Sequence, residues 1–260
     1  MADNFYKAII KKDLRTVFSD KLIYLPFILV PVIFCVILPI GAFIGSAFGN
    51  SANGLNSIPL PGIDPSYNAG DKVLAVALGM LFPSLFLLIP IMSGSIVAAT
   101  GFIGEKEKKT IESLLYTRIS IEQLFKAKIL SAFVPSFLLT LASFILFFVI
   151  SMAGLSIVGS HYVFPFMKWF VLIFWLSPVI TLLAIFIMVL TSAKAKSFQE
   201  AQQRVVFIIL PVVLIILGQV SGLFYLDTLV IFIAGLFILG INYFMLKLAV
   251  KSYTAEKLVM

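Results

Sequence analysis

The chain has 260 residues, of which 61% are hydrophobic and only 12% charged, and its mean hydropathy is +1.13. These values exclude an ordinary soluble domain, and the single cysteine, Cys35, excludes an intramolecular disulfide or a cysteine-based metal site. Several long stretches carry no charge, and a membrane-crossing helix needs roughly 20 apolar residues. Because lipid offers no hydrogen-bond partners to the backbone, we predict an all-α membrane protein with six transmembrane helices.

Residues 1–21, before the first predicted span, show the pattern of an amphipathic helix. Tyr6, Ile10 and Leu14 share one helical face, whereas Lys7 and Lys11 share another. A helix of this kind lies in the membrane interface, with its basic face in water. We therefore predict an N-terminal amphipathic interfacial helix.

The uncharged runs define the predicted spans, which are 22–48, 73–103, 129–153, 169–193, 205–222 and 228–247. In this topology all Lys and Arg residues lie on the side of the termini, except Lys72 and Lys168, which fall in loops on the other side. The positive-inside rule then places both termini in the cytoplasm. Orientation and lipid attraction explain this basic excess better than nucleic-acid binding, which needs an organised basic face.

Small and polar residues within the spans indicate how the helices pack. Gly41, Gly45 and Gly49 lie four residues apart in the first span, a spacing that permits close contact within the chain or with a second copy. Gln219 is the best candidate to face a substrate path, although helix packing explains most polar residues of the spans. Prolines recur and predict kinks at Pro26, Pro31, Pro39, Pro83, Pro90, Pro135, Pro178 and Pro211.

Residues of the kinds that carry chemistry are missing from the predicted spans. Apart from Lys247, the last residue of the span 228–247, they contain no Asp, Glu, Lys or Arg, which ion-coupled carriers commonly need there. The only histidine, His161, is expected as an exposed residue of an outer loop, and no Gly-rich phosphate-binding loop occurs. We expect no enzymatic activity and no cofactor or metal in this chain, and any energy for work to come from a partner.

The cytoplasmic segment 104–128, GEKEKKTIESLLYTRISIEQLFKAK, is the most specific part of the sequence. Its apolar residues form two helical faces, made of Ile111, Leu114 and Leu115 and of Ile121, Leu124 and Phe125. Ser120 and Gln123 have the spacing of a capping box at the start of the second helix. We predict two short amphipathic helices here; a solvated loop is the alternative, and it would leave both apolar faces exposed.

This segment resembles the corresponding part of the membrane subunits of type-2 ABC transporters, export permeases that share the fold of the G-subfamily. The matching positions are Glu105-Lys106-Glu107, Thr110-x-Glu112-x-Leu114-Leu115, Thr117, Ser120 and Lys128. The chain departs from the pattern at Lys109, Arg118 and Ala127, where the family has Gly, Pro and Gly. The resemblance implies one type-2 transmembrane domain over 1–260, with 104–128 transmitting movement between ATPase and spans.

The resemblance also implies partners and roles. Two permease chains, identical or related, would pair in the membrane, each bound to an ABC ATPase subunit that holds ATP and Mg. The residues implied to couple the chain to the ATPase are Glu105, Glu107, Thr110, Glu112, Arg118, Ser120 and Glu122. The short loops indicate the cytoplasmic membrane of a prokaryote.

The resemblance leads us to expect the permease of an ATP-driven exporter. The uncharged spans, in a chain with 26 Phe, favour a hydrophobic or amphipathic substrate such as a peptide, a toxin or a drug-like molecule. Sodium efflux is the runner-up, because the loop 194–203 also resembles that of sodium- and drug-efflux permeases. A secondary carrier and a non-transporting scaffold or immunity protein are alternatives of another class.

Overall fold

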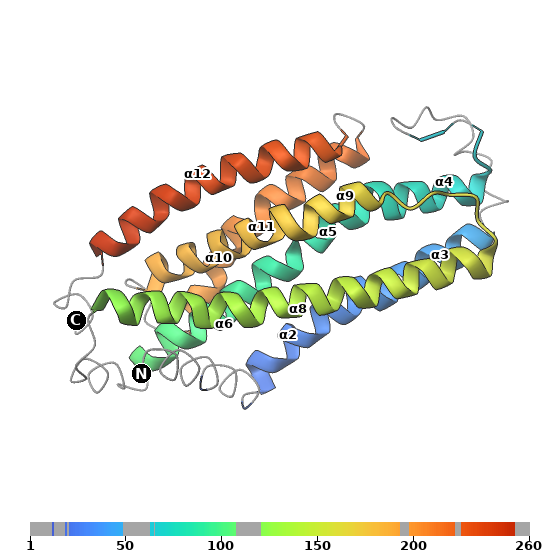
Figure 1. Cartoon of the computed structure of the whole chain (residues 1–260). Coiled ribbons are helices and arrows are strands. Elements are labelled where there is room, and N and C mark those ends of the chain that lie inside the picture. The colour runs from blue at the N-terminus through green and yellow to red at the C-terminus, as the bar shows by residue number, and fades with distance from the viewer. Residues whose placement is uncertain are drawn as a thin grey trace.

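The computed structural model describes residues 12, 19, 21–48, 63–64, 66–107, 121–192, 198–221 and 225–252. Every regular element in these ranges is a helix, so the all-α prediction is confirmed. The helices lie roughly along one direction and form an elongated bundle (Figure 1).

Apolar runs and the breaks between them set the order of the elements. The first pass along the bundle consists of α2 (Lys21–Val32), η1 (Ile33–Ile37) and α3 (Leu38–Phe48). The second consists of α4 (Ala69–Val76), η4 (Ala77–Leu81), α5 (Phe82–Phe86) and α6 (Leu88–Glu107). The later elements are α8 (Ile121–Val158), α9 (Phe166–Val171), η5 (Leu172–Leu176), α10 (Ser177–Ser192), α11 (Phe198–Val220) and α12 (Thr228–Ser252).

Within the described ranges, five helical stretches are long and apolar enough to cross a membrane: Tyr24–Phe48, Ala69–Phe102, Lys126–Val158, Phe166–Thr191 and Thr228–Lys247. The chain is therefore a multi-pass membrane protein. The remaining predicted span, 205–222, corresponds to α11, whose apolar stretch Ile209–Gln219 is shorter. The count of six spans stays a prediction.

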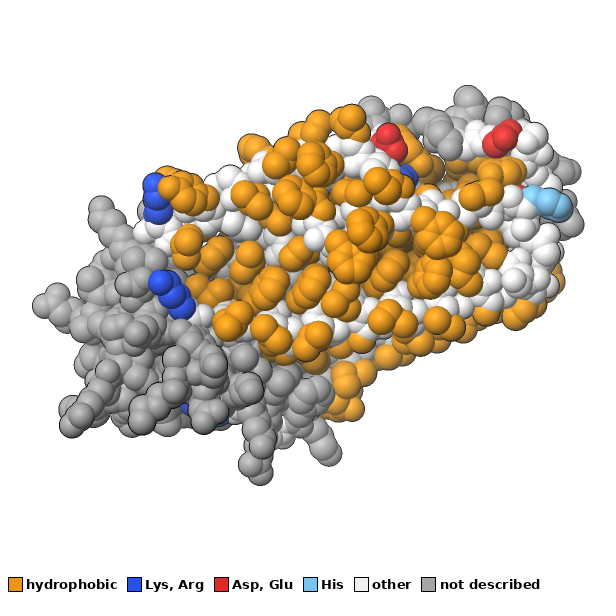
Figure 2. All heavy atoms as spheres, in the orientation of Figure 1, with side chains coloured by type: hydrophobic (Ala, Val, Ile, Leu, Met, Phe, Trp, Pro, Cys, Tyr) orange, Lys and Arg blue, Asp and Glu red, His pale blue; other side chains and the backbone are white. Residues whose placement is uncertain are grey.

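The two ends of the bundle differ in charge. Figure 1 places the start of α2, the end of α6, the start of α8 and the end of α12 at one end, which we call the α6–α8 end. The end of α3, the start of α4 and the end of α8 lie at the opposite, α3–α4 end, and α9 begins short of that end. On the face shown in Figure 2, most visible Lys and Arg side chains lie toward the first end, and the acidic and His side chains toward the second. This distribution agrees with a cytoplasmic α6–α8 end, which remains a prediction.

Three prolines coincide with widened helical turns. The π-helical turns η1, η4 and η5 each end immediately before a residue that precedes proline. In each, this residue donates its N–H to the carbonyl five residues back: Leu38 to Ile33, Phe82 to Ala77 and Ser177 to Leu172. A proline lacks an N–H, and its ring crowds the carbonyl four residues back, so a π turn relieves the crowding. Pro39, Pro83 and Pro178 thus lie at local irregularities of three predicted spans.

Two loop assignments at the α3–α4 end are wrong. Lys72 and Lys168, expected in outer loops, lie in α4 and α9, and their side chains are only 8% and 4% exposed. The predicted spans 73–103 and 169–193 are each bounded by the nearest charged residue, here Lys72 and Lys168. The helices continue past these residues because a long basic side chain can reach polar partners at the end of a span.

The segment 104–128 is also organised differently from the prediction at its two ends. α6 continues through Glu107, and the second predicted short helix is the beginning of α8, which runs unbroken from Ile121 to Val158. No Pro or Gly lies between Ile121 and Pro135 to end the helix. Residues 108–120, and the predicted interfacial helix 1–21 apart from residues 12, 19 and 21, lie outside the described ranges.

Candidate functional site

The predicted coupling residues lie at the α6–α8 end of the bundle or outside the described ranges. Glu105 and Glu107 belong to the end of α6, and Glu122 to the first turn of α8. Only the backbone of these three residues is described. Outside the described ranges lie Thr110, Glu112, Arg118 and Ser120. The coupling roles therefore stay predictions.

Lys128 joins the two helices that flank the coupling segment. It lies in α8, is 6% exposed, and donates a 2.7 Å hydrogen bond from Nζ to the carbonyl oxygen of Gly101 in α6. Its ammonium group also lies 5.1 Å from the centre of the Phe102 ring, within cation–π range. The end of the second pass is therefore held against the start of the third, next to the predicted coupling residues.

Gln219, predicted to face a substrate path, is buried between α11 and α5. Its Oε1 atom accepts a 2.7 Å hydrogen bond from the Ser84 hydroxyl, and the residue is 2% exposed. Its Nε2 atom has no partner in the described part of the chain. A buried donor without a partner is costly, so Nε2 can donate a hydrogen bond to a polar group that enters between the helices. Its role in a substrate path is not tested by these contacts.

Lys168 joins three elements near the α3–α4 end. From α9, its Nζ atom donates to the carbonyl oxygen of Gly79 in η4 at 2.8 Å and to the Tyr225 hydroxyl at 2.7 Å. The ammonium group lies 4.0 Å from the centre of the Tyr225 ring. Burial raises the pKa of Tyr225 and the Asp227 carboxylate raises it further, so the phenol keeps its proton.

A second polar group holds the connection between α8 and α9. Gly159 ends α8 with a φ of 63°, a left-handed conformation that glycine adopts without steric cost. The next residue, Ser160, donates its hydroxyl to the buried Asp71 carboxylate in α4 and accepts the backbone N–H of Tyr162 at 3.1 Å. Burial raises the pKa of Tyr162, so this phenol is neutral. The connection is thus anchored to the second pass.

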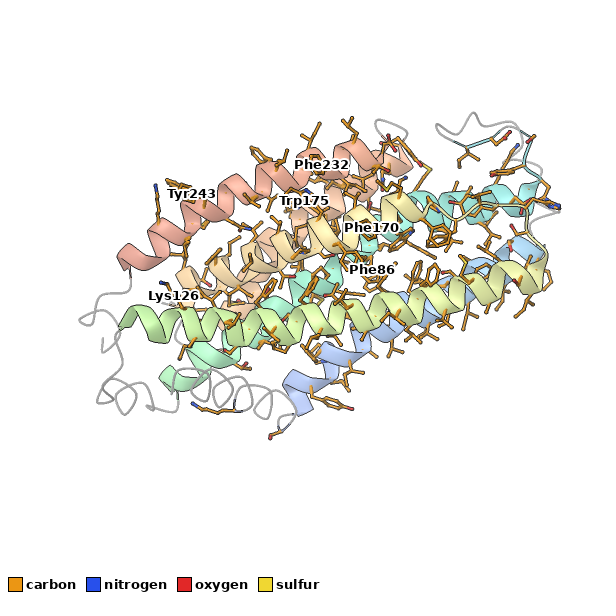
Figure 3. The ribbon with its side chains drawn as sticks, in the orientation of Figure 1. Phe86, Lys126, Phe170, Trp175, Phe232 and Tyr243 are labelled. Carbon is orange, nitrogen blue, oxygen red and sulfur yellow. The ribbon has the colours of Figure 1, made fainter. Side chains whose placement is uncertain are left out.

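Aromatic rings fill the space between α5, α8 and α9. Trp169 is fully buried and lies 4.5 Å from the Phe147 ring and 5.5 Å from the Phe86 ring, measured between centroids. Figure 3 shows Phe86 in the interior, toward α8. Edge-to-face and tilted pairs of this kind add to the stability given by burial alone. This cluster packs the second, third and fourth passes together.

An apolar groove of about 430 Å³ opens on the outside of this cluster, between α8 and α9. Trp169 lies at its base, while Phe166 and Phe170 are more than half exposed. Phe170 is labelled in Figure 3 on α9. The full lining is Phe144, Phe148, Phe166, Met167, Trp169 and Phe170. A groove of this composition can hold an aliphatic or aromatic group from the membrane.

The close helix contacts lie at glycines other than those predicted. A Cβ atom built on Gly154 of α8 would lie 2.3 Å from the Phe43 ring, and one on Gly235 of α12 would lie 2.2 Å from Nε1 of Trp175. Gly41 and Gly45 have nothing within 4 Å of such a Cβ atom, and Gly49 lies outside the described ranges. Packing within the chain is thus not seen at Gly41 and Gly45, and packing against a second copy stays a prediction.

Sequence reasoning missed the contacts that tie the helices together, above all those of Lys128 and Lys168 and the Ser84–Gln219 hydrogen bond. The lysines carried a usable signal, because each lies at the boundary of an uncharged run, where a basic side chain can reach inward. In the described ranges no group of three or more His, Cys, Asp and Glu residues is arranged to hold a metal ion. His161 is exposed in the connection between α8 and α9.

The comparison with protein families identifies the chain. Residues 69–199 match the family model described as ABC-2 family transporter protein, which covers half of the chain. The match includes the second, third and fourth passes with the segment 104–128, so the resemblance inferred from that segment is confirmed. Neither a curated protein nor a solved structure matches the chain. The chain belongs to the ABC-2 transporter family and is a transmembrane subunit of an ABC transporter, a family role that implies an ABC ATPase as its partner.

Proposed function

We propose that this chain is the permease of an ATP-driven exporter that moves a hydrophobic or amphipathic molecule, such as a peptide, toxin or drug-like compound, outward across the cytoplasmic membrane of a prokaryote. Family membership supports the role of permease. ATP and Mg are bound by the separate ATPase, and two permease chains, identical or related, form the transport path. The termini and the α6–α8 end face the cytoplasm, where the ATPase binds.

The aromatic groove between α8 and α9 is the observation that carries the choice of substrate. Its lining is made of Phe, Trp and Met side chains, and it opens at the outside of the bundle, where a molecule dissolved in the bilayer can reach it. Apolar pockets favour apolar ligands because binding removes apolar surface from water or from loosely packed lipid. Sodium ions need oxygen ligands, which this groove does not provide.

Transport itself is tested in inverted membrane vesicles that contain the chain and its ATPase subunit. We expect Mg-ATP to drive accumulation of a hydrophobic fluorescent dye, and Phe170→Ala to reduce it more than Phe237→Ala, an exposed control in α12. Accumulation of ²²Na⁺ without dye would instead establish the sodium-efflux alternative. Absence of any ATP-dependent accumulation would favour a scaffold.

Coupling is tested at Glu112, which matches an acidic position that the family places near the ATPase. Removing one member of a buried ion pair costs about 3–5 kcal/mol, and removing an exposed one far less. We expect Glu112→Ala to leave membrane insertion intact and to lower both transport and the stimulation of ATP hydrolysis by substrate. The control Lys257→Ala, which also removes one charge, should change neither. Unchanged transport in Glu112→Ala, at equal yield of the complex, would remove the transmission role from 104–128.

A further inference from the structure

The turn before Pro83 leaves two backbone carbonyls without their usual helical donors. The N–H of Phe82 bonds to Ala77 instead of Leu78, because the turn is π-helical. Pro83 has no N–H to offer to Gly79. Inside a membrane such carbonyls need other partners, since lipid supplies none.

Both carbonyls receive donors from adjacent residues of α9. The indole Nε1 of Trp169 donates to Leu78 at 3.2 Å, and Nζ of Lys168 donates to Gly79 at 2.8 Å. Both side chains are buried, and Lys168 also binds Tyr225. At the turns before Pro39 and Pro178, no side-chain donor reaches the equivalent carbonyls of Cys35 and Phe174 within the described ranges. The turn before Pro83 is therefore distinguished by its attachment to another pass.

A second close contact joins the same two passes further along the bundle. A Cβ atom built on Gly94 of α6 would lie 3.2 Å from the carbonyl oxygen of Thr181 and 3.6 Å from the Cβ atom of Ala184, both in α10. The contact between α6 and α10 is also the most extensive between any two described elements. Two attachments at separate levels resist both sliding and rotation of one helix against the other.

We propose that Lys168 and Trp169 latch the fourth predicted span to the second at the turn before Pro83, so that these two spans move as one rigid body during the transport cycle. This inference rests on the proposed function, because it concerns the movements that accompany transport. The unlatched turn before Pro39, in the first predicted span, then remains available for bending. Lys168 acts here as a positioning residue, since it fixes the backbone of a neighbouring span.

The test measures how often the two spans are in contact. Cysteines replace Gly94 and Ala184 in a Cys35→Ser background, because their Cβ atoms fall in the range of a disulfide. Disulfide formation with membrane-permeant copper phenanthroline is timed in inverted vesicles that hold the chain and its ATPase subunit. The conditions are no nucleotide, Mg-ATP, and Mg-ATP with vanadate. Dye accumulation is recorded in the same vesicles.

We expect the same rate of disulfide formation in all three conditions with Lys168 present, and also with Lys168→Arg, which keeps a donor. With Lys168→Met the rate should fall by about tenfold in at least one nucleotide condition, because the contact between α6 and α10 is then formed in only a small fraction of the molecules. The control Lys247→Met, at an exposed lysine of α12, should behave like the parent. A nucleotide-dependent rate in the parent, or a constant rate in Lys168→Met, would overturn the latch.

A second measurement tests the latch if the variant with the two cysteines does not fold. Hydrogen exchange of residues 77–86 is compared between the unmodified chain and Lys168→Met, each with its ATPase subunit. The amides of this turn should exchange faster in Lys168→Met, and equal exchange would contradict the latch. Failure of the proposed function would show separately, as vesicles that accumulate no dye while the disulfide rates still report on the contact.

Discussion

Two glycines of α12, Gly235 and Gly240, show how strongly the surroundings decide the role of a residue. Gly235 faces Trp175, whose indole donates a 3.1 Å hydrogen bond to the carbonyl oxygen of Phe232 and whose ring stacks on the Phe232 ring. Figure 3 shows this pair between α12 and the neighbouring pass. A Cβ atom built on Gly240 would have no atom within 4 Å.

We predict that Gly235→Ala destabilises the protein, because the added methyl group would lie 2.2 Å from the indole nitrogen. Overpacking of this kind costs about 1–3 kcal/mol. Gly240→Ala should be neutral or slightly stabilising, since alanine favours the helix by up to about 1 kcal/mol over glycine. Thermal unfolding of the purified proteins in detergent measures both effects. Equal melting temperatures for the two variants would contradict the close contact at Gly235.

At the scale of single residues, the sequence predicted little of the polar network. Gln219 was singled out as a candidate to face a substrate path, which stays a prediction, but its partner Ser84 lies 135 residues away in sequence, and no local pattern connects them. Lys168 was assigned to a loop because charge normally marks the end of a span. Its carbonyl partner, Gly79, lies 89 residues away in the sequence, so no local pattern connects the two residues.

The helical elements followed from the sequence more closely, because the membrane imposes a simple rule. The uncharged run after Lys21 corresponds to the pass formed by α2, η1 and α3, which ends at Phe48. The start of α8 was predicted less well, since amphipathic periodicity at 121–125 also fits the first turns of a long helix. Of the eight prolines at which kinks were predicted, Pro39, Pro83 and Pro178 lie at π turns, and proline alone does not tell a π turn from a kink.

The exposed small-residue face of α3 carries a prediction about assembly. Gly41 and Gly45 have open space around them in the single chain, so a larger side chain there should not disturb its fold. If a second permease packs on this face, Gly45→Leu should weaken the pair, because small residues allow the helices to approach closely. The amount of cross-linked dimer in native membranes, relative to the yield of the folded chain, measures the association of the two permeases.

Gly240→Leu is the matched control for this prediction, because it also projects into open space from a different helix. It should leave cross-linking unchanged. An undiminished pair in Gly45→Leu would mean that any second copy packs elsewhere.

For the molecule as a whole, the different charges at the two ends of the bundle predict its orientation in the membrane, which labelling can measure. The connection between α8 and α9 should face outward, and residue 108 should face the cytoplasm. In a Cys35→Ser background, a cysteine at the exposed His161 should react with a membrane-impermeant maleimide in intact cells. A cysteine at Lys108 should react only after permeabilisation. Labelling of position 108 from outside would overturn the orientation.

The chain has two tryptophans, and their environments differ in a way that makes fluorescence informative. Trp169 is sealed among aromatic rings with its indole bonded to Leu78, whereas Trp175 is partly exposed beside Phe232. A quencher carried on lipid chains, such as a brominated acyl group, approaches Trp169 only through the groove between α8 and α9, which Trp169 lines. Quenching of the Trp169 emission therefore reports on occupancy of that groove without any added label.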